Sequence, residues 1–94
     1  MIPAGAPLFN PGQVVATPAA LEFCEVNAIH PLTLIHRHCH GDFGDMDHED
    51  IAANVQAIKS GARVFSSYQV GTNKVWVITE SDRTSTCILL PNEY

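Results

Sequence analysis

Residues 47–91, DHEDIAANVQAIKSGARVFSSYQVGTNKVWVITESDRTSTCILLP, contain the pattern that decides the fold. Asp47 stands where its side chain can accept hydrogen bonds from the free N–H groups of a helix start, and Gly61 stands where a helix would end. Met46 and Ile51 occupy the two positions of a hydrophobic staple. The pattern therefore predicts a helix between Asp47 and Gly61. Its expected core stripe is Ile51, Val55 and Ile58.

Three β-branched and aromatic runs follow this helix, and short polar turns separate them. They are Arg63 to Val70, Lys74 to Glu80 and Ser85 to Pro91. Such runs are typical of strands joined as an antiparallel meander. Alternation places Val64, Ser66, Tyr68 and Val70 on one face of the first strand, and Trp76, Ile78 and Glu80 on one face of the second. We expect the helical core stripe to pack on this meander.

Two shorter helices are predicted before residue 47. Gln13 to Ala16 reads as a short extended piece, and Thr17-Pro18 is an N-cap followed by proline at the first helical position. That helix should run to about Val26, and Asn27 is a plausible left-handed cap. Its inward residues should be Ala20, Leu21 and Cys24.

His30-Pro31 begins the second of these helices, and Gly41 ends it. Leu34, Ile35 and His38 share one of its faces. The whole order predicts an α+β fold, in which three N-terminal helices pack on a C-terminal three-stranded antiparallel β-meander, with a short N-terminal extended segment as a further element.

Length and composition predict one globular domain. The chain has 94 residues, of which 46% are hydrophobic and 16% charged. We expect a flexible N-terminal segment over residues 1–11 and a single domain over residues 12–94. No apolar stretch approaches the roughly 20 residues of a membrane span, and the first residues lack the pattern of a signal peptide. A cytoplasmic protein is the expectation, with no cofactor.

Charge is distributed unevenly. The formal net charge is −5, and residues 1–60 hold two basic residues against seven acidic ones. This balance disfavours strong binding to nucleic acid, which depends on clustered Lys and Arg. It suits a basic protein partner. The three cysteines, Cys24, Cys39 and Cys87, are scattered, which argues against a disulfide framework.

Four histidines lie between residues 36 and 48, and they raise the alternative of a metal site. His36 and His40 are spaced to share a helical face, and Cys39 or His48 could complete a tetrahedral shell. The remaining candidates lie on other faces or in an acidic loop. The leading prediction is therefore that no metal is bound, with His36, Cys39, His40 and His48 as the alternative ligand set.

Two nucleophile and base arrangements are open alternatives as well. Cys39 beside Arg37 and two histidines could have a lowered pKa and act as a nucleophile. A metal-free ribonuclease would need a base, an acid and phosphate-stabilising groups. Its candidate residues are His38, Arg63, Glu80, Arg83 and Thr86, with Ser66 and Tyr68 nearby on the first strand of the meander.

Residues 12–94 resemble a widespread family of small proteins carried on bacterial plasmids, phages and integrated elements, often labelled plasmid-related and sometimes as a restriction subunit. Phe43 stands where that pattern more often has tryptophan. A fainter similarity is to barnase-type and RelE-type nuclease domains. The resemblance to the plasmid-related family rests on the following residues: GQVVATPAAL (12–21), Arg37, His38, Gly41, Asp42, Gly44, Asp45, Asp50, Ala53, Asn54, Gly61, Arg63, Ser66, Tyr68, Trp76, Ile78 to Glu80, Asp82, Arg83, Thr86, Ile88 to Pro91, Glu93 and Tyr94.

The resemblance implies a role that faces the bacterial host. We expect a protein-binding inhibitor of host defence, of the anti-CRISPR or antirestriction kind, acting on a basic defence protein or nuclease complex. A toxin-like ribonuclease is the alternative, and a homodimer is possible. Phe43 between two glycines is expected to be an exposed anchor. The expected partner-binding residues are Asp42, Phe43, Asp45, Asp47, Glu49 and Asp50.

Overall fold

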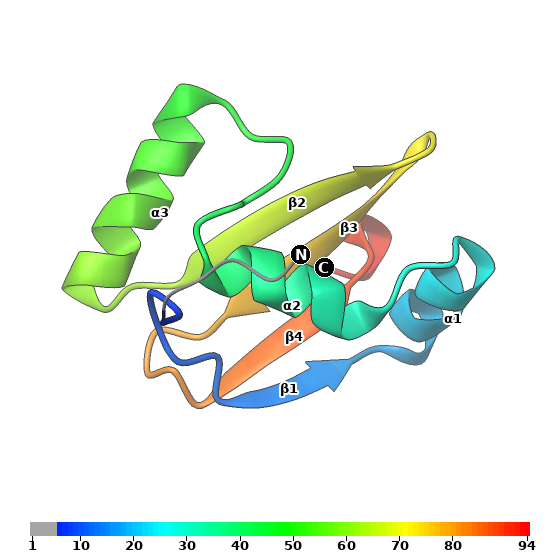
Figure 1. Cartoon of the computed structure of the whole chain (residues 1–94), viewed down its shortest axis with the longest axis horizontal. Coiled ribbons are helices and arrows are strands. Elements are labelled where there is room, and N and C mark those ends of the chain that lie inside the picture. Colours follow the sequence, from blue (N-terminus) through cyan, green and yellow to red (C-terminus); the bar gives the residue numbers. More distant parts are fainter. Residues whose placement is uncertain (1–5) are drawn as a thin grey trace.

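The computed structural model describes residues 6–94, and its elements follow the predicted α+β order (Figure 1). Three helices precede an antiparallel meander of β2, β3 and β4. In chain order the elements are β1 (Gln13–Ala16), α1 (Pro18–Val26), α2 (Pro31–Cys39), α3 (His48–Ser60), β2 (Val64–Val70), β3 (Asn73–Thr79), β4 (Ser85–Leu89) and the 3-10 helix η1 (Pro91–Glu93).

The predicted extended piece at residues 13–16 is a fourth strand of the sheet. β1 pairs in parallel with β4, which gives the strand order β1-β4-β3-β2. The first strand of the chain therefore lies beside the last, and the meander gains an edge strand whose pairing local sequence signals did not predict. A parallel partner must come from a distant part of the chain, since it cannot be reached by a tight turn.

Helices α1 and α2 cover one face of the sheet (Figure 1). The predicted alternation in β2 is confirmed, and the side chains of Val64, Ser66 and Tyr68 all lie on this covered face, where they are buried. The main core cluster brings together both helices and three strands. Its buried members are Ala20, Cys24, Leu34, Ile35, Cys39, Tyr68, Val75, Val77 and Ile88.

The two short helices begin where the sequence predicts. The Thr17 side chain accepts a hydrogen bond from the Ala20 N–H at 3.1 Å, and a proline follows each N-cap. Two predictions about α1 are wrong. Leu21 is 47% exposed because it lies on the outer side of the helix, and the left-handed residue after α1 is Ala28 (φ 56°) and not Asn27.

Helix α3 has the predicted ends but a different buried face. Asp47 caps its start, accepting from the Asp50 N–H at 2.9 Å, and Gly61 closes it in the left-handed conformation. The predicted core stripe is wrong, because Ile51 and Val55 are 37% and 44% exposed and only Ile58 is partly buried. The buried residues of α3 are Asn54 and Ala57.

Asn54 explains this rotation of α3. Its carboxamide donates to the Phe65 carbonyl oxygen at 2.6 Å and accepts from the Phe65 N–H at 3.0 Å. These backbone groups lie on the outer edge of β2, which has no further strand beside it in the described residues 6–94. The side chain thus takes the place of a neighbouring strand, and satisfying a sheet edge outweighs burying two more aliphatic side chains.

Replacing Asn54 by Ala should lower the free energy of unfolding by about 2 kcal/mol, because two partly buried backbone groups lose their partners. Denaturant unfolding at neutral pH measures this. Gln56→Ala, at an exposed position on the same helix, is the matched control and should change stability by less than about 0.5 kcal/mol. Equal stability of the two variants would show that the two hydrogen bonds between the Asn54 carboxamide and the Phe65 backbone contribute nothing to the free energy of unfolding.

The segment before β1 is held in place over the residues that the structure describes from Leu8 onward. The Leu8 N–H donates to the Cys39 carbonyl at 2.8 Å, and Phe9 packs against both core clusters. Within the segment that was predicted to be flexible, Phe9 thus packs in an apolar site that local sequence could not indicate. Residues 1–5 lie outside the described part.

Candidate functional site

The acidic segment between α2 and α3 lies on the surface. Asp42, Asp45, Asp47, Glu49 and Asp50 are all exposed. Two of these side chains already make contacts within the protein. Asp42 pairs with Arg37, whose Nε lies 2.6 Å from Oδ2, and this contact holds the pKa of the Asp42 carboxyl below its ordinary value. Asp47 caps α3. The carboxylates of Asp45, Glu49 and Asp50 make no ion pair within residues 6–94.

Phe43 is not exposed, so its predicted role as a surface anchor is wrong. Its side chain is 4% exposed and forms a second core cluster with Ala57 and Val64. The backbone explains the burial. The Ser67 N–H donates to the Phe43 carbonyl at 3.0 Å and the Asp45 N–H donates to the Ser67 carbonyl at 2.7 Å, so this loop pairs with β2 and points the ring inward.

The exposed apolar side chains nearest in sequence to the acids are Ile51 and Val55. They lie one helical turn apart on the flank of α3, and both follow the free carboxylates Glu49 and Asp50 along the helix. Sequence reasoning had assigned both to the core. No local signal in the sequence marks their exposure, because the face that α3 buries is set by Asn54, whose backbone partner Phe65 lies on a different element.

His38 is fully buried at the centre of a chain of hydroxyl groups. Its Nδ1 lies 2.5 Å from Ser66 Oγ, and its Nε2 lies 2.8 Å from Thr79 Oγ1. Thr79 Oγ1 lies 2.6 Å from Thr86 Oγ1, and the Thr86 hydroxyl donates to the Pro11 carbonyl at 2.7 Å. The network joins α2, all three strands of the meander and the segment before β1.

The terminal carbonyl sets the direction of the hydrogen bonds from Thr86 back to His38 Nε2. A carbonyl oxygen can only accept, so the Thr86 hydroxyl donates its hydrogen to the Pro11 carbonyl and must accept a hydrogen bond from Thr79. Thr79 in turn accepts from His38 Nε2–H. Burial, with a smaller effect of the positive charge of Arg83, lowers the pKa of His38 to about 4. The ring is therefore neutral at pH 7, and its unprotonated Nδ1 accepts from the Ser66 hydroxyl.

This geometry gives no support to the ribonuclease alternative. A general base must reach the substrate proton directly or through one water, and His38 has no exposed surface. Thr86 is buried in the same network. On the surface, Arg63 donates to Glu80 and to Tyr94, both at 3.1 Å. The candidate groups are therefore divided between the two sides of the sheet.

Arg83 holds α3 against the β3–β4 turn. Its guanidinium donates to the backbone carbonyls of Ala57 at 3.0 Å, Ala62 at 2.6 Å and Glu80 at 3.0 Å. These carbonyls lie at the end of α3 and at the start of the turn. With its donors directed at the backbone, Arg83 serves as a clamp and not as a free phosphate-binding group.

The alternative metal ligands do not converge. The rings of His36 and His40 stack with centroids 4.1 Å apart, Cys39 is buried, and His48 begins a different helix. Among residues 6–94, no three His, Cys, Asp or Glu side chains are grouped so that they could hold a metal ion. The hypothesis of a nucleophilic Cys39 is not supported either, since burial raises the pKa of its thiol and so disfavours the thiolate.

Comparison of the chain with protein families, with curated proteins and with solved structures finds no match in any of the three. Within the described residues, no helix has the length and apolar character needed to cross a membrane.

Proposed function

We propose that this protein acts by binding another protein through an acidic surface at the start of α3. We infer further that it is an accessory protein of a mobile genetic element, and that it inhibits a basic host defence protein of the kind that anti-CRISPR or antirestriction proteins act on. The observation that carries the proposal is the group of exposed carboxylates of Asp45, Glu49 and Asp50, which have no ion pair in residues 6–94.

Electrostatic complementarity supports this role. The protein has a formal net charge of −5, and seven of its ten acids lie within residues 1–60. Complementary charge speeds the encounter of two proteins and selects the partner, even where it adds little to affinity. A basic surface that normally contacts nucleic acid is the natural target of such a face. The context of a mobile element comes from the resemblance described above.

Apolar contacts must supply most of the affinity, and α3 offers them. Ile51 and Val55 replace Phe43 as the apolar contacts of the proposed interface, since both are exposed beside the carboxylates. Interface energy concentrates in a few positions near the centre of the contact that are surrounded by weaker contacts. An aliphatic pair flanked by free acids matches that arrangement on a small scale.

The proposal is tested by a pull-down from a bacterial host, followed by affinity measurements on the recovered complex. Glu49→Lys should weaken binding severalfold and reduce its dependence on salt, and Val55→Ser should weaken it about tenfold. Both positions are exposed on α3 and neither caps it, so the fold should survive.

Matched controls lie on α1, at the other end of the molecule in Figure 1. Glu25→Lys and Val26→Ser make the same chemical changes at exposed positions there, and should leave binding unchanged. If Glu49→Lys and Val55→Ser both bind the partner as the unsubstituted protein does at every salt concentration, this surface is not the interface.

A further inference from the structure

Strand β1 forms an open edge of the sheet, and its backbone leaves hydrogen-bonding groups free on that edge. The strand order β1-β4-β3-β2 places β4 on one side of β1 and no strand of residues 6–94 on the other. The N–H groups of Gln13 and Thr17 donate to carbonyl oxygens in and next to β4, both at 3.0 Å. Because backbone groups alternate in direction along a strand, Val14 and Ala16 turn their N–H and C=O groups to the open side.

The opposite edge of the sheet, by contrast, is closed by the protein itself. On β2, the carboxamide of Asn54 binds both backbone groups of Phe65, and the loop that carries Phe43 pairs with Ser67. No loop or side chain of residues 6–94 forms such hydrogen bonds with the outward groups of β1. The sheet thus has one satisfied edge and one edge that is available to a further strand.

Within residues 13–16, β1 has none of the features that usually protect an edge strand. Natural edges are blunted by charged side chains, proline, bulges or a covering segment. The residues of β1 are QVVA, their register with β4 is unbroken, and Val14 and Val15 are 38% and 41% exposed. Only its length of four residues limits what β1 can pair with, so the partner strand must match it closely.

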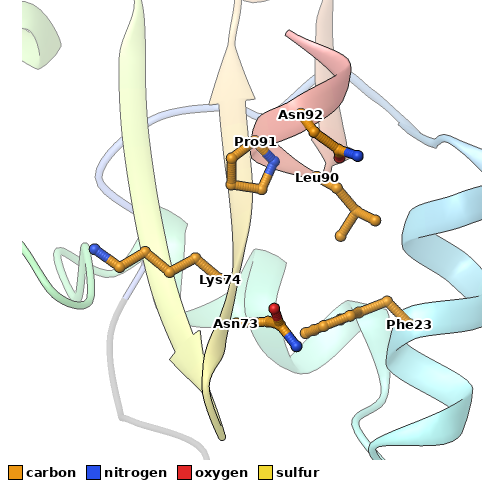
Figure 2. Close-up of a pocket in the computed structure, with 6 residues that line it drawn as sticks. All are labelled: Phe23, Asn73, Lys74, Leu90, Pro91 and Asn92. Carbon is orange, nitrogen blue, oxygen red and sulfur yellow. The ribbon is translucent and has the colours of Figure 1, made fainter.

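The surroundings of β1 carry little charge. Residues 1–21 contain no charged side chain, and at the end of β1 the Glu93 carboxylate is engaged by the Thr17 hydroxyl at 2.7 Å. Helix α3, which bears free carboxylates of the acidic surface, lies beside β2 at the other edge (Figure 1). In the close-up of the pocket between α1, β3 and η1, the Lys74 side chain also extends across β2, away from β1 (Figure 2). Two copies of formal net charge −5 therefore meet with least repulsion at β1.

We propose that β1 pairs with β1 of a second copy of this chain, antiparallel across a two-fold axis that passes through Val15. This register sets Val14 opposite Ala16 of the second copy on both sides of the axis. Each of these pairs exchanges two hydrogen bonds, and the two Val15 side chains meet as the closer, non-hydrogen-bonded pair. The two four-stranded sheets become one continuous sheet.

A second copy is the partner that fits this edge, because a two-fold contact is self-complementary. The outward donors of one β1 meet the outward acceptors of the other, and small apolar side chains face one another without a buried charge. The inference does not depend on the proposed function, since pairing at β1 leaves the acidic surface at the other edge of each sheet free.

Sedimentation equilibrium over a wide range of protein concentrations tests for association, and a reversible equilibrium between monomer and dimer is expected. Amide hydrogen exchange at low and high concentration locates the contact. Exchange at Val14 and Ala16 should slow as the dimer forms, because their N–H groups gain partners. Exchange at Val15, whose N–H faces β4 in both states, should change much less.

Two substitutions at the edge should each weaken the dimer by about tenfold. Val15→Lys sets like charges opposite each other on the axis. Val14→Pro removes an outward N–H in each copy without breaking a hydrogen bond to β4. Val26→Lys, at an exposed position on α1, makes the same chemical change as the first variant and should leave the dimer unchanged. Circular dichroism checks that each variant is folded.

A monomer at every concentration would overturn the proposal. So would a dimer that both edge variants form as tightly as the unsubstituted protein, or one whose formation does not slow exchange at Val14 and Ala16. If the edge variants fail to fold, the exchange measurement on the unsubstituted protein still decides. Glu49→Lys should weaken binding of the proposed partner and leave this dimer unchanged, which keeps the two proposals separate.

Discussion

The free energy of unfolding should fall by about 3 kcal/mol as the pH is lowered from 7 to 4, because folding keeps His38 neutral. The buried ring has a pKa of about 4 in place of its ordinary 6.5. Ser66 and Thr79 are the partners of its two nitrogens, and the network contains no acid in the part of the chain that the structure describes. Protonation would add a hydrogen to Nδ1, the atom that now accepts a hydrogen bond from the Ser66 hydroxyl.

The sign follows from proton binding in the two states. Between pH 4 and pH 6.5 the unfolded chain binds a proton at His38 that the folded protein does not, so stability rises with pH over that window. Below about pH 4 both states are protonated and this contribution stops changing. Asp42 and Asp82, whose pKa values are lowered, lose their stabilising contributions only at still lower pH.

Urea unfolding at a series of pH values measures the slope, and the NMR titration of the His38 ring identifies the group. The control is His38→Gln, which cannot titrate in this window. Although that variant should be less stable at neutral pH, its stability should vary much less between pH 4 and pH 6.5. Stability of the unsubstituted protein that stays flat across the window would contradict a buried neutral His38.

The second large effect is expected at Gly44. An added Cβ there would overlap the carbonyl oxygen of Ser67 and lie 2.7 Å from the Tyr68 ring, and Gly44 also has a φ of +79°. Relief requires the loop that carries Phe43 to move off β2. Gly44→Ala should therefore lower the free energy of unfolding by about 3 to 5 kcal/mol, which for a domain of this size is a large part of the total.

Gly71→Ala separates the two causes. Gly71 also has a positive φ, +61°, but nothing lies within 4 Å of an added Cβ. It should cost only about 1 kcal/mol, the usual cost of a left-handed residue that carries a side chain. Thermal and urea unfolding compare the two. If Gly44→Ala and Gly71→Ala are equally stable, the close approach of the loop to β2 contributes nothing to the cost of substituting Gly44.

Several of the residues that suggested a family resemblance from the sequence have structural roles in this protein. Asn54 completes the edge of β2, and Arg83 clamps the end of α3. His38 organises the buried hydroxyl network. The Arg37 guanidinium pairs with Asp42 and lies over the Tyr68 ring at 4.5 Å, while the Tyr68 hydroxyl donates to the Asp42 carbonyl at 2.6 Å. A motif rich in polar residues therefore need not mark a catalytic centre.

The amino-acid sequence by itself determined the elements and their ends. Thr17 and Asp47 cap N–H groups three residues away, and Gly61 ends α3, so these signals are complete within one helical turn. Alternation in β2 is likewise local. Such contacts cost little chain entropy and need no distant partner, which is why the α+β order could be predicted.

Only the tertiary structure decided which faces those elements bury and what the polar residues do. The partner of β1 is β4, about 70 residues later, and Asn54 meets its backbone partner on a different element. Phe43 turned inward because its loop pairs with Ser67, while Ile51 and Val55 were left outside. The physical reason is that each buried hydrogen-bonding group must find a partner, and the partners that satisfied this fold come from segments far apart in the chain.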